Sequence, residues 1–267
     1  YMDSLTLEMR FMDSAFASTE TTLFDLNVAH PVQCAAMCRS RLLDRASPFW
    51  EAPYMEEFAA AVKEAGSWFW AGAVFLPQLQ RLINTGVPVV RIVKPAQNEG
   101  WDENSHILHE LKDAEARGCV AVGMDIDVFY GEKTGDEPPY RYSLGPKTMD
   151  EMQRFVEATS LPFIVKGVLS VQDAIKCQEI GAQGIVVSHH GGEAIDFAVP
   201  ILRVLPRTYT SSGCITAWHY CSTSGFSRSR PGCSAYPHST GLTWPRSTGA
   251  RSNPSPGNRP RRRPRWD

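Results

Sequence analysis

The sequence lacks three features that would each assign it to a class of protein. It has no run of about 18 apolar residues, so no helix is expected to cross a membrane. It has no G-x-G-x-x-G fingerprint after an apolar run, which argues against a Rossmann dinucleotide-binding domain. Its seven cysteines form no C-x-x-C pair and have no histidine at metal-ligand spacing. We therefore expect reduced cysteines, a cytoplasmic location, no membrane partner and no bound metal.

Charge is divided unevenly along the 267 residues, although the formal net charge is only −2. Residues 1–206 contain 17 Lys and Arg against 28 Asp and Glu, whereas residues 207–267 contain ten Arg, no Lys and one acid. The second segment is also rich in Ser and Pro, and it has scarcely any apolar periodicity, so we expect disorder there. Three origins stay open for this tail: translation in the wrong frame, which the composition favours, natural disorder, or a nucleic-acid-binding element, which is the least favoured. The start at Tyr1, with no signal peptide, is interpreted as that of a fragment or a processed chain.

Between these ends, short apolar runs alternate with helical patterns. Repeated β-α units predict a parallel sheet with right-handed crossovers. Six consecutive units fit an α/β fold of the (β/α)8 TIM-barrel class, incomplete by two units. The expected organisation is a lead-in segment over 1–27, a partial barrel over 28–206 and the tail over 207–267. The predicted strands are 31–36, 68–74, 87–93, 119–124, 161–165 and 184–188, and the predicted helices are 55–65, 79–83, 106–117, 149–158 and 171–180.

Polar side chains stand at the ends of two neighbouring predicted strands. Lys166 ends one apolar run, and Ser188, His189 and His190 end the next. Because adjacent parallel strands end about 5 Å apart, these side chains are expected to face one pocket. A lysine in an apolar strand is costly unless it meets an anion or a ligand. Lys166 is therefore either a functional group or half of a structural ion pair, and residues 189–192 are either functional or a plain strand-to-loop turn.

The same stretch resembles the FMN-dependent α-hydroxy-acid oxidases and dehydrogenases, which include glycolate and lactate oxidases. That family runs P-F-[IV]-[VL]-K-G, then a helix, then G-[AV]-x-G-[IV]-x-V-S-N-H-G-[GA]-R-Q-L-D. This chain reads PFIVKG over residues 162–167 and GAQGIVVSHHGGEAID over 181–196. Weaker similarity over 18–32 and 120–128 extends the resemblance to roughly residues 5–206.

The resemblance implies an FMN cofactor and a small α-hydroxy acid as substrate. It is compatible with a homo-oligomer. It implies that His190 takes the substrate hydroxyl proton while a hydride passes to the flavin, and that Asp127 holds the imidazole. It places Lys166 at the electron-rich edge of the flavin. The further flavin contacts that it implies are Ser188, Asp125, Arg91, Ala36 and Met37.

The chain departs from the family pattern at several of these places. Glu193 stands where the family has the arginine that clamps the substrate carboxylate, and His189 replaces an asparagine. Arg91 and Val93 take the places of a glutamine and a tyrosine, and Asp125 that of a threonine. The family's N-terminal helical segment is not found. The phosphate-binding D-G-G-[VI]-R and G-R loops have no counterpart after residue 205, so weak FMN binding and little turnover are expected.

Other interpretations stay open beside this one. They are a neighbouring FMN or phosphate-binding barrel, such as a type 2 isopentenyl-diphosphate isomerase or an inosinate-dehydrogenase relative, a lysine Schiff-base aldolase using Lys166, and a non-catalytic partial gene product. The aromatic residues 68–70 are interpreted as core, and Lys133 as surface charge. His106 and His109 are interpreted as part of a solvated helix face.

Overall fold

A computed structural model describes residues 4–6, 9, 11–13, 16–38, 54–97, 104–127, 143–190, 197–211, 216–219 and 226–227, all within the compact unit Tyr1–Cys233. Glu193, Lys133 and the rest of the stretch between residues 127 and 143 lie outside these ranges. No helix in the described part of the chain is both long enough and apolar enough to span a membrane.

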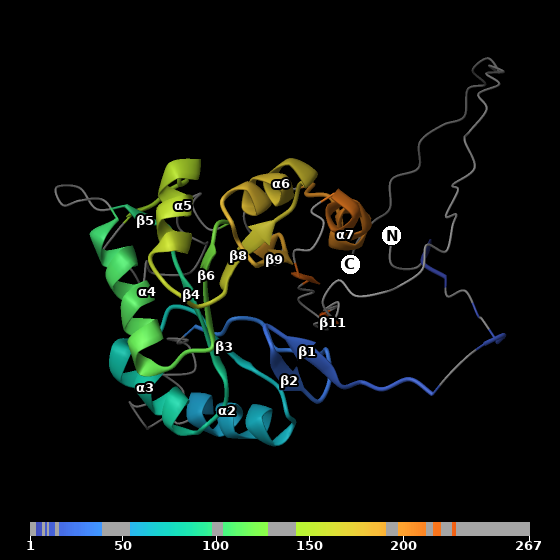
Figure 1. The fold of residues 1–267 in the computed structure, drawn as a ribbon, viewed down its shortest axis with the longest axis horizontal. Coiled ribbons are helices and arrows are strands. Elements are labelled where there is room, and N and C mark those ends of the chain that lie inside the picture. The colour runs from blue at the N-terminus through green and yellow to red at the C-terminus, as the bar shows by residue number, and fades with distance from the viewer. Residues whose placement is uncertain are drawn as a thin grey trace, which may run out of the picture. The chain divides into compact units, whose positions relative to one another are not determined.

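A seven-stranded sheet organises the fold, and its parallel strands follow one another in chain order (Figure 1). Sequential order is the winding of a barrel, whereas a doubly wound sheet reverses direction at a switch point. The antiparallel strand β11 (Phe226–Ser227) pairs with the last parallel strand. The parallel strands are β3 (Phe69–Ala71), β4 (Val89–Val93), β6 (Ala121–Asp125), β8 (Phe163–Val168), β9 (Gly184–Val187) and β10 (Thr216–His219).

The five predicted helices are present, each with bounds within three residues of the prediction, and α7 is a further helix that was not predicted. The helices are α2 (Tyr54–Glu64), α3 (Leu76–Asn84), α4 (Ser105–Arg117), α5 (Met149–Glu157), α6 (Val171–Glu179) and α7 (Ile201–Ser211). Thr148 and Glu151 form a reciprocal capping box at the start of α5, in which each side chain accepts a hydrogen bond from the other residue's backbone N–H. Two short antiparallel pairs complete the described elements: β1 (Thr21–Leu23) with β2 (Leu26–Val28), and β5 (Ala96–Gln97) with β7 (Ser143–Leu144).

Side chains of the parallel strands alternate between two buried layers. One layer packs against the helices and includes Phe69, Val89, Val122, Phe163 and Ile185. The other includes Trp68, Trp70, Val90, Ile92, Ala121, Ile164 and Val186, and the hairpin β1–β2 covers part of it with Leu23 and Val28. The expectation that the aromatic residues are core agrees with this burial. We call the second layer the inner face, because in a barrel winding it is the face turned away from the helices.

Three features differ from the sequence-based expectation. The first apolar run, 31–36, forms no strand, and a single parallel bridge joins the following Met37 to Ala71. The hairpin β1–β2 was not predicted. Helix α7 continues through Pro206 to residue 211, so the boundary expected at 206 lies inside a helix, and β10 then joins the sheet beyond it.

Candidate active site

Charged side chains meet where the central parallel strands end. Asp125 is the last residue of β6, and Asp127 follows two residues later. Lys166 stands directly opposite Asp125 on β8, and His190 comes just after β9. Both Lys166 and Asp125 are buried. Since parallel strands point the same way, these residues share the carboxyl edge of the sheet, which is where barrel enzymes carry their sites.

The Lys166 ammonium lies at the centre of this cluster. Its Nζ is 2.7 Å from Asp125 Oδ1, 3.1 Å from His190 Nδ1 and 3.7 Å from Asp127 Oδ1. The cost of burying a lysine is therefore offset by a direct charged partner. The sequence left open whether Lys166 is a functional group or half of a structural ion pair. The ion pair with Asp125 is present, and it lies at the strand ends, where a functional role is also possible.

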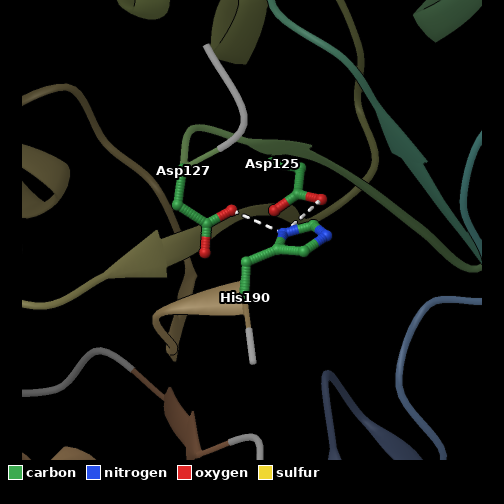
Figure 2. A group of neighbouring side chains, drawn as sticks. All are labelled: Asp125, Asp127 and His190. Atoms are coloured by element: carbon green, nitrogen blue, oxygen red, sulfur yellow. Dashed lines mark hydrogen bonds and ion pairs between the residues drawn. The ribbon is translucent and has the colours of Figure 1, made fainter. Parts of the chain in front are cut away.

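The imidazole of His190 is oriented by carboxylates. Nδ1 lies 2.8 Å from Asp127 Oδ1 and 3.4 Å from Asp125 Oδ2, and Figure 2 shows both acids turned toward this one nitrogen. Carboxylates only accept hydrogen bonds, so a proton on Nδ1 is donated to Asp127, and in that tautomer the 3.1 Å approach of Lys166 Nζ to Nδ1 is a contact and not a hydrogen bond. In the neutral ring the other nitrogen, Nε2, then carries the lone pair and can act as a base.

A tight turn presents His190 to these acids. Its backbone has a φ of 52°, in the left-handed region that few residues other than glycine adopt readily. The backbone N–H of His190 donates to Ser188 Oγ at 3.0 Å, and Ser188 is fully buried. This local hydrogen bond offsets part of the cost of the turn, because it satisfies an amide that leaves the sheet.

Lys94 is a member of the cluster that the sequence reasoning missed. It follows β4 directly, and its Nζ lies 2.5 Å from Asp125 Oδ2. Burial alone would raise the pKa of Asp125, but the ammonium groups of Lys166 and Lys94 hold that pKa well below its usual range. The Asp125 carboxylate is therefore ionised at neutral pH. The available signal was position, since Lys94 ends its strand at the same edge as Lys166.

Metal binding is chemically conceivable for part of this cluster. One oxygen each from Asp125 and Asp127 and a nitrogen of His190 lie within 4.8 Å of one another. The Lys166 ammonium, however, contacts all three groups and supplies the positive charge that a metal would bring. A cation at this place would have to displace the lysine.

Three of the residues expected to contact the flavin do not join the cluster. Arg91 lies on the helix side of β4, where its guanidinium donates to Gly72 O and pairs with Glu110 of α4 at 2.9 Å. Met37 packs against the helix-side core, whereas Ala36 packs against the inner-face core. Alternation explains the position of Arg91, because Val90 and Ile92 occupy the inner face on either side of it.

Comparison with known proteins bears directly on these residues. Residues 140–215 match the family model described as FMN-dependent dehydrogenase, and this stretch holds Lys166, Ser188 and His190. The predicted family resemblance is confirmed. A 4-hydroxymandelate oxidase of Amycolatopsis orientalis is 41% identical over 71 residues, which are 26% of this chain and 20% of the relative. An L-lactate oxidase of Alicycliphilus denitrificans is 42% identical over 64 residues, which are 24% and 18% of the two chains.

Longer matches are also found. A peroxisomal (S)-2-hydroxyacid oxidase of Arabidopsis thaliana is 47% identical over 119 residues, which are 45% of this chain and 31% of the relative. A mandelate oxidase variant solved with a monooxide FMN adduct is 25% identical with a TM-score of 0.63, and the match covers 76% of this chain and 60% of that one. With the sequential strand order, this likeness confirms the (β/α)8-barrel class, present here in part. The chain spans about a fifth of the length of the first two curated relatives.

Proposed function

We propose that this chain carries the reaction site of an FMN-dependent oxidoreductase that oxidises small α-hydroxy acids. The observation that carries the proposal is the pair formed by His190 Nδ1 and Asp127 Oδ1 at 2.8 Å, beside the buried ammonium of Lys166. This is the set of a base, its orienting acid and a fixed cation that an alcohol oxidation needs. The oxidases of mandelate, lactate and 2-hydroxy acids to which the chain is similar support the substrate class.

Two residues of the chain have distinct roles in such a reaction. His190 Nε2 takes the proton of the substrate hydroxyl, which leaves the imidazole positively charged. Asp127 accepts a hydrogen bond from Nδ1–H, so its carboxylate lies beside the positive charge that the ring gains. FMN, when bound, supplies the acceptor for the hydride that leaves the substrate carbon.

The residues present fit the ring end of FMN. Lys166 provides a fixed ammonium, and Ser188 provides a hydroxyl at the end of the neighbouring strand. A cation there stabilises the negative charge that a flavin gains when it is reduced. The sequence after residue 205 contains no counterpart of the family's phosphate-binding loops, so no residues in it match those that would bind the phosphate group of FMN.

This difference predicts how the chain distinguishes two flavins. FMN and riboflavin differ only in the phosphate, so without a phosphate grip both should bind weakly and with Kd values within about threefold of each other. Several charge-assisted hydrogen bonds to the phosphate, each worth about 1.5–3 kcal/mol, would instead favour FMN by orders of magnitude. Fluorescence titration of the purified 267-residue chain with each flavin measures the ratio. Tight, strongly FMN-selective binding would contradict the prediction.

Flavin reduction tests the proposed function itself. Because weak FMN binding and slow turnover are expected, the chain is first saturated with FMN and is then mixed without oxygen, in separate samples, with glycolate, L-lactate or mandelate. At least one of these acids should bleach the visible absorbance of the flavin, and a hydroxyl-free analogue such as propionate should not. No bleaching by any hydroxy acid at saturating FMN would contradict the proposal.

The alternatives drawn from the sequence are weaker in light of the site. A Schiff-base aldolase needs a lysine whose amine is free to attack a carbonyl, whereas Nζ of Lys166 is held by Asp125 Oδ1 at 2.7 Å. The hydroxy-acid oxidases named above do not favour an isopentenyl-diphosphate isomerase or a non-catalytic product. The cytoplasmic location stays a prediction based on cysteine usage, and one of the relatives is peroxisomal.

A further inference from the structure

Strand β8 contains an irregularity next to the cluster. Lys166 pairs with Val186 of β9 and Val168 pairs with Val187, so Gly167 is an extra residue without a partner in the ladder. Its φ is +99°, a conformation that side-chain-bearing residues rarely adopt. A bulge of this kind bends a strand and redirects its side chains, and such bulges are frequent beside active sites.

Asp127 lies against the bare side of this glycine. A Cβ added to Gly167 would come within 2.5 Å of Asp127 Cγ, 2.6 Å of its Cβ and 2.9 Å of its backbone nitrogen. Real Cβ atoms do not approach other heavy atoms so closely. Two of these three atoms are the backbone nitrogen and Cβ, so rotation of the carboxylate could not relieve the overlap.

We propose that Gly167 is a positioning residue, whose missing side chain sets the place of the Asp127 carboxylate and through it the orientation of His190. The inference rests on the proposed function, because it assigns a role within the same site. Asp127 accepts from the imidazole at 2.8 Å, and a displacement of about 1 Å would break a bond of that length.

Backbone hydrogen bonds tie both sides of the site to this bulge. The N–H of Ile126, the residue before Asp127, donates to Lys166 O at 2.8 Å. The N–H of Ser188, two residues before His190, donates to Val168 O at 3.2 Å. Gly167 therefore lies between the attachment points of the acid and of the imidazole. A side chain there would push Asp127 away while the turn that carries His190 stays attached to β8.

Two other glycines allow the steric role of Gly167 to be distinguished from the cost of a positive φ alone. Gly118 has a φ of +93°, and an added Cβ would meet nothing within 4 Å. Gly181 has a φ of +80°, and its added Cβ would make only an ordinary 3.9 Å contact with Val156. Alanine at either place carries the backbone strain of a left-handed residue without the steric conflict. They serve as matched controls.

The first test is spectroscopic and uses the whole chain without flavin. Nitrogen-15 NMR of labelled histidine reports the hydrogen-bonded Nδ1–H of His190, assigned by its absence from His190→Ala. Gly167→Ala should lose this signal, whereas Gly118→Ala and Gly181→Ala should keep it although all three lower stability. Retention of the signal in Gly167→Ala, or its loss in both controls, would overturn the proposal.

The second test applies if the Gly167→Ala variant folds too poorly for the spectroscopic test. Asp127→Gly removes the two side-chain atoms in conflict, so Gly167→Ala should lower the folding equilibrium constant about tenfold less in that background than in the parent chain. Urea denaturation of the four proteins measures the difference. Equal losses in both backgrounds, or no recovery of folding in the double variant, would overturn the proposal. Neither test depends on flavin or turnover, so a failure of the proposed function would be recognised separately in the flavin-reduction assay.

Discussion

Replacement of His190 by alanine is expected to slow substrate oxidation by about 10²–10⁴-fold at saturating FMN, which is the usual contribution of a general base. The physical reason is that Nε2 is the lone-pair nitrogen of an imidazole whose Nδ1 is held by Asp127. Without the ring, the lone pair of Nε2 that takes the hydroxyl proton is lost. The rate of flavin bleaching after anaerobic mixing measures the effect directly, without a contribution from the electron acceptor.

His189→Ala is the matched control, because it removes the same side chain one residue earlier. The ring that pairs with Asp125 and Asp127 is that of His190, so replacement of His189 should change the rate far less than replacement of His190. Flavin affinity should survive in both variants, since neither removes Lys166 or Ser188. Equal rates for the parent chain and His190→Ala would mean that another group acts as the base.

Element type was largely predictable from the sequence, and the reason is the strength of two signals. Runs such as 68–74 and 119–124 are apolar without interruption, which is typical of parallel strands covered on both sides. The helices have clear start signals, such as the capping box formed by Thr148 and Glu151. The hairpin β1–β2 escaped prediction because its strands have three residues each and alternate too briefly to show a period.

The face of the sheet on which each strand side chain lies was much less predictable. A strand that is buried on both faces has no polar alternation, so its sequence does not reveal which residues belong to which face. Arg91 was therefore taken from the family resemblance as a flavin contact, although it points toward α4 and pairs with Glu110. Lys94 was missed although its position at a strand end was an available signal, and its place on the same side of β4 as Val90 and Ile92 becomes visible only in the sheet.

The grouping of the strand-end residues was predictable, because parallel strands bring their carboxyl ends to one edge of the sheet whichever face each side chain lies on. Lys166, Ser188, His190 and Asp127 all follow or end apolar runs, and parallel strands bring such positions to one edge. The structure places them together, with direct contacts between Lys166, Asp127 and His190. Their roles in catalysis stay predictions until turnover is measured. The bulge at Gly167 could not have been expected from spacing, because it depends on the register of β8 against β9.

Asp125→Asn is expected to cost about 3–5 kcal/mol of unfolding free energy at pH 7, the range found when one member of a buried ion pair is removed. Asp125 is 2% exposed, and each of its oxygens meets an ammonium group, Lys166 on one and Lys94 on the other. The amide keeps the shape of the side chain but removes the negative charge. Two cations would then remain at a place with little access to water. Urea denaturation of the parent chain and the variant measures the loss.

The loss should depend on pH with a definite sign. A carboxyl whose pKa is depressed in the folded state contributes stability that is complete above its unfolded pKa, near 3.9, and is lost as pH falls through the folded value. The ammonium partners hold the pKa of Asp125 well below its usual range. The gap between parent and variant should therefore be full at pH 7 and shrink only below about pH 4.

Asp113→Asn provides the control for an ordinary surface pair. Asp113 pairs with Arg117 one turn later on α4, and both side chains retain contact with solvent. Its loss should cost about 0.5 kcal/mol or less, because exposed pairs of this spacing contribute little. If Asp125→Asn costs no more than Asp113→Asn, or if the Asp125 gap widens as pH falls below 4, then the carboxylate is not the ionised centre of the cluster. The two lysines would in that case be balanced by other groups, and the electrostatic basis for placing Lys166 beside a flavin would be lost.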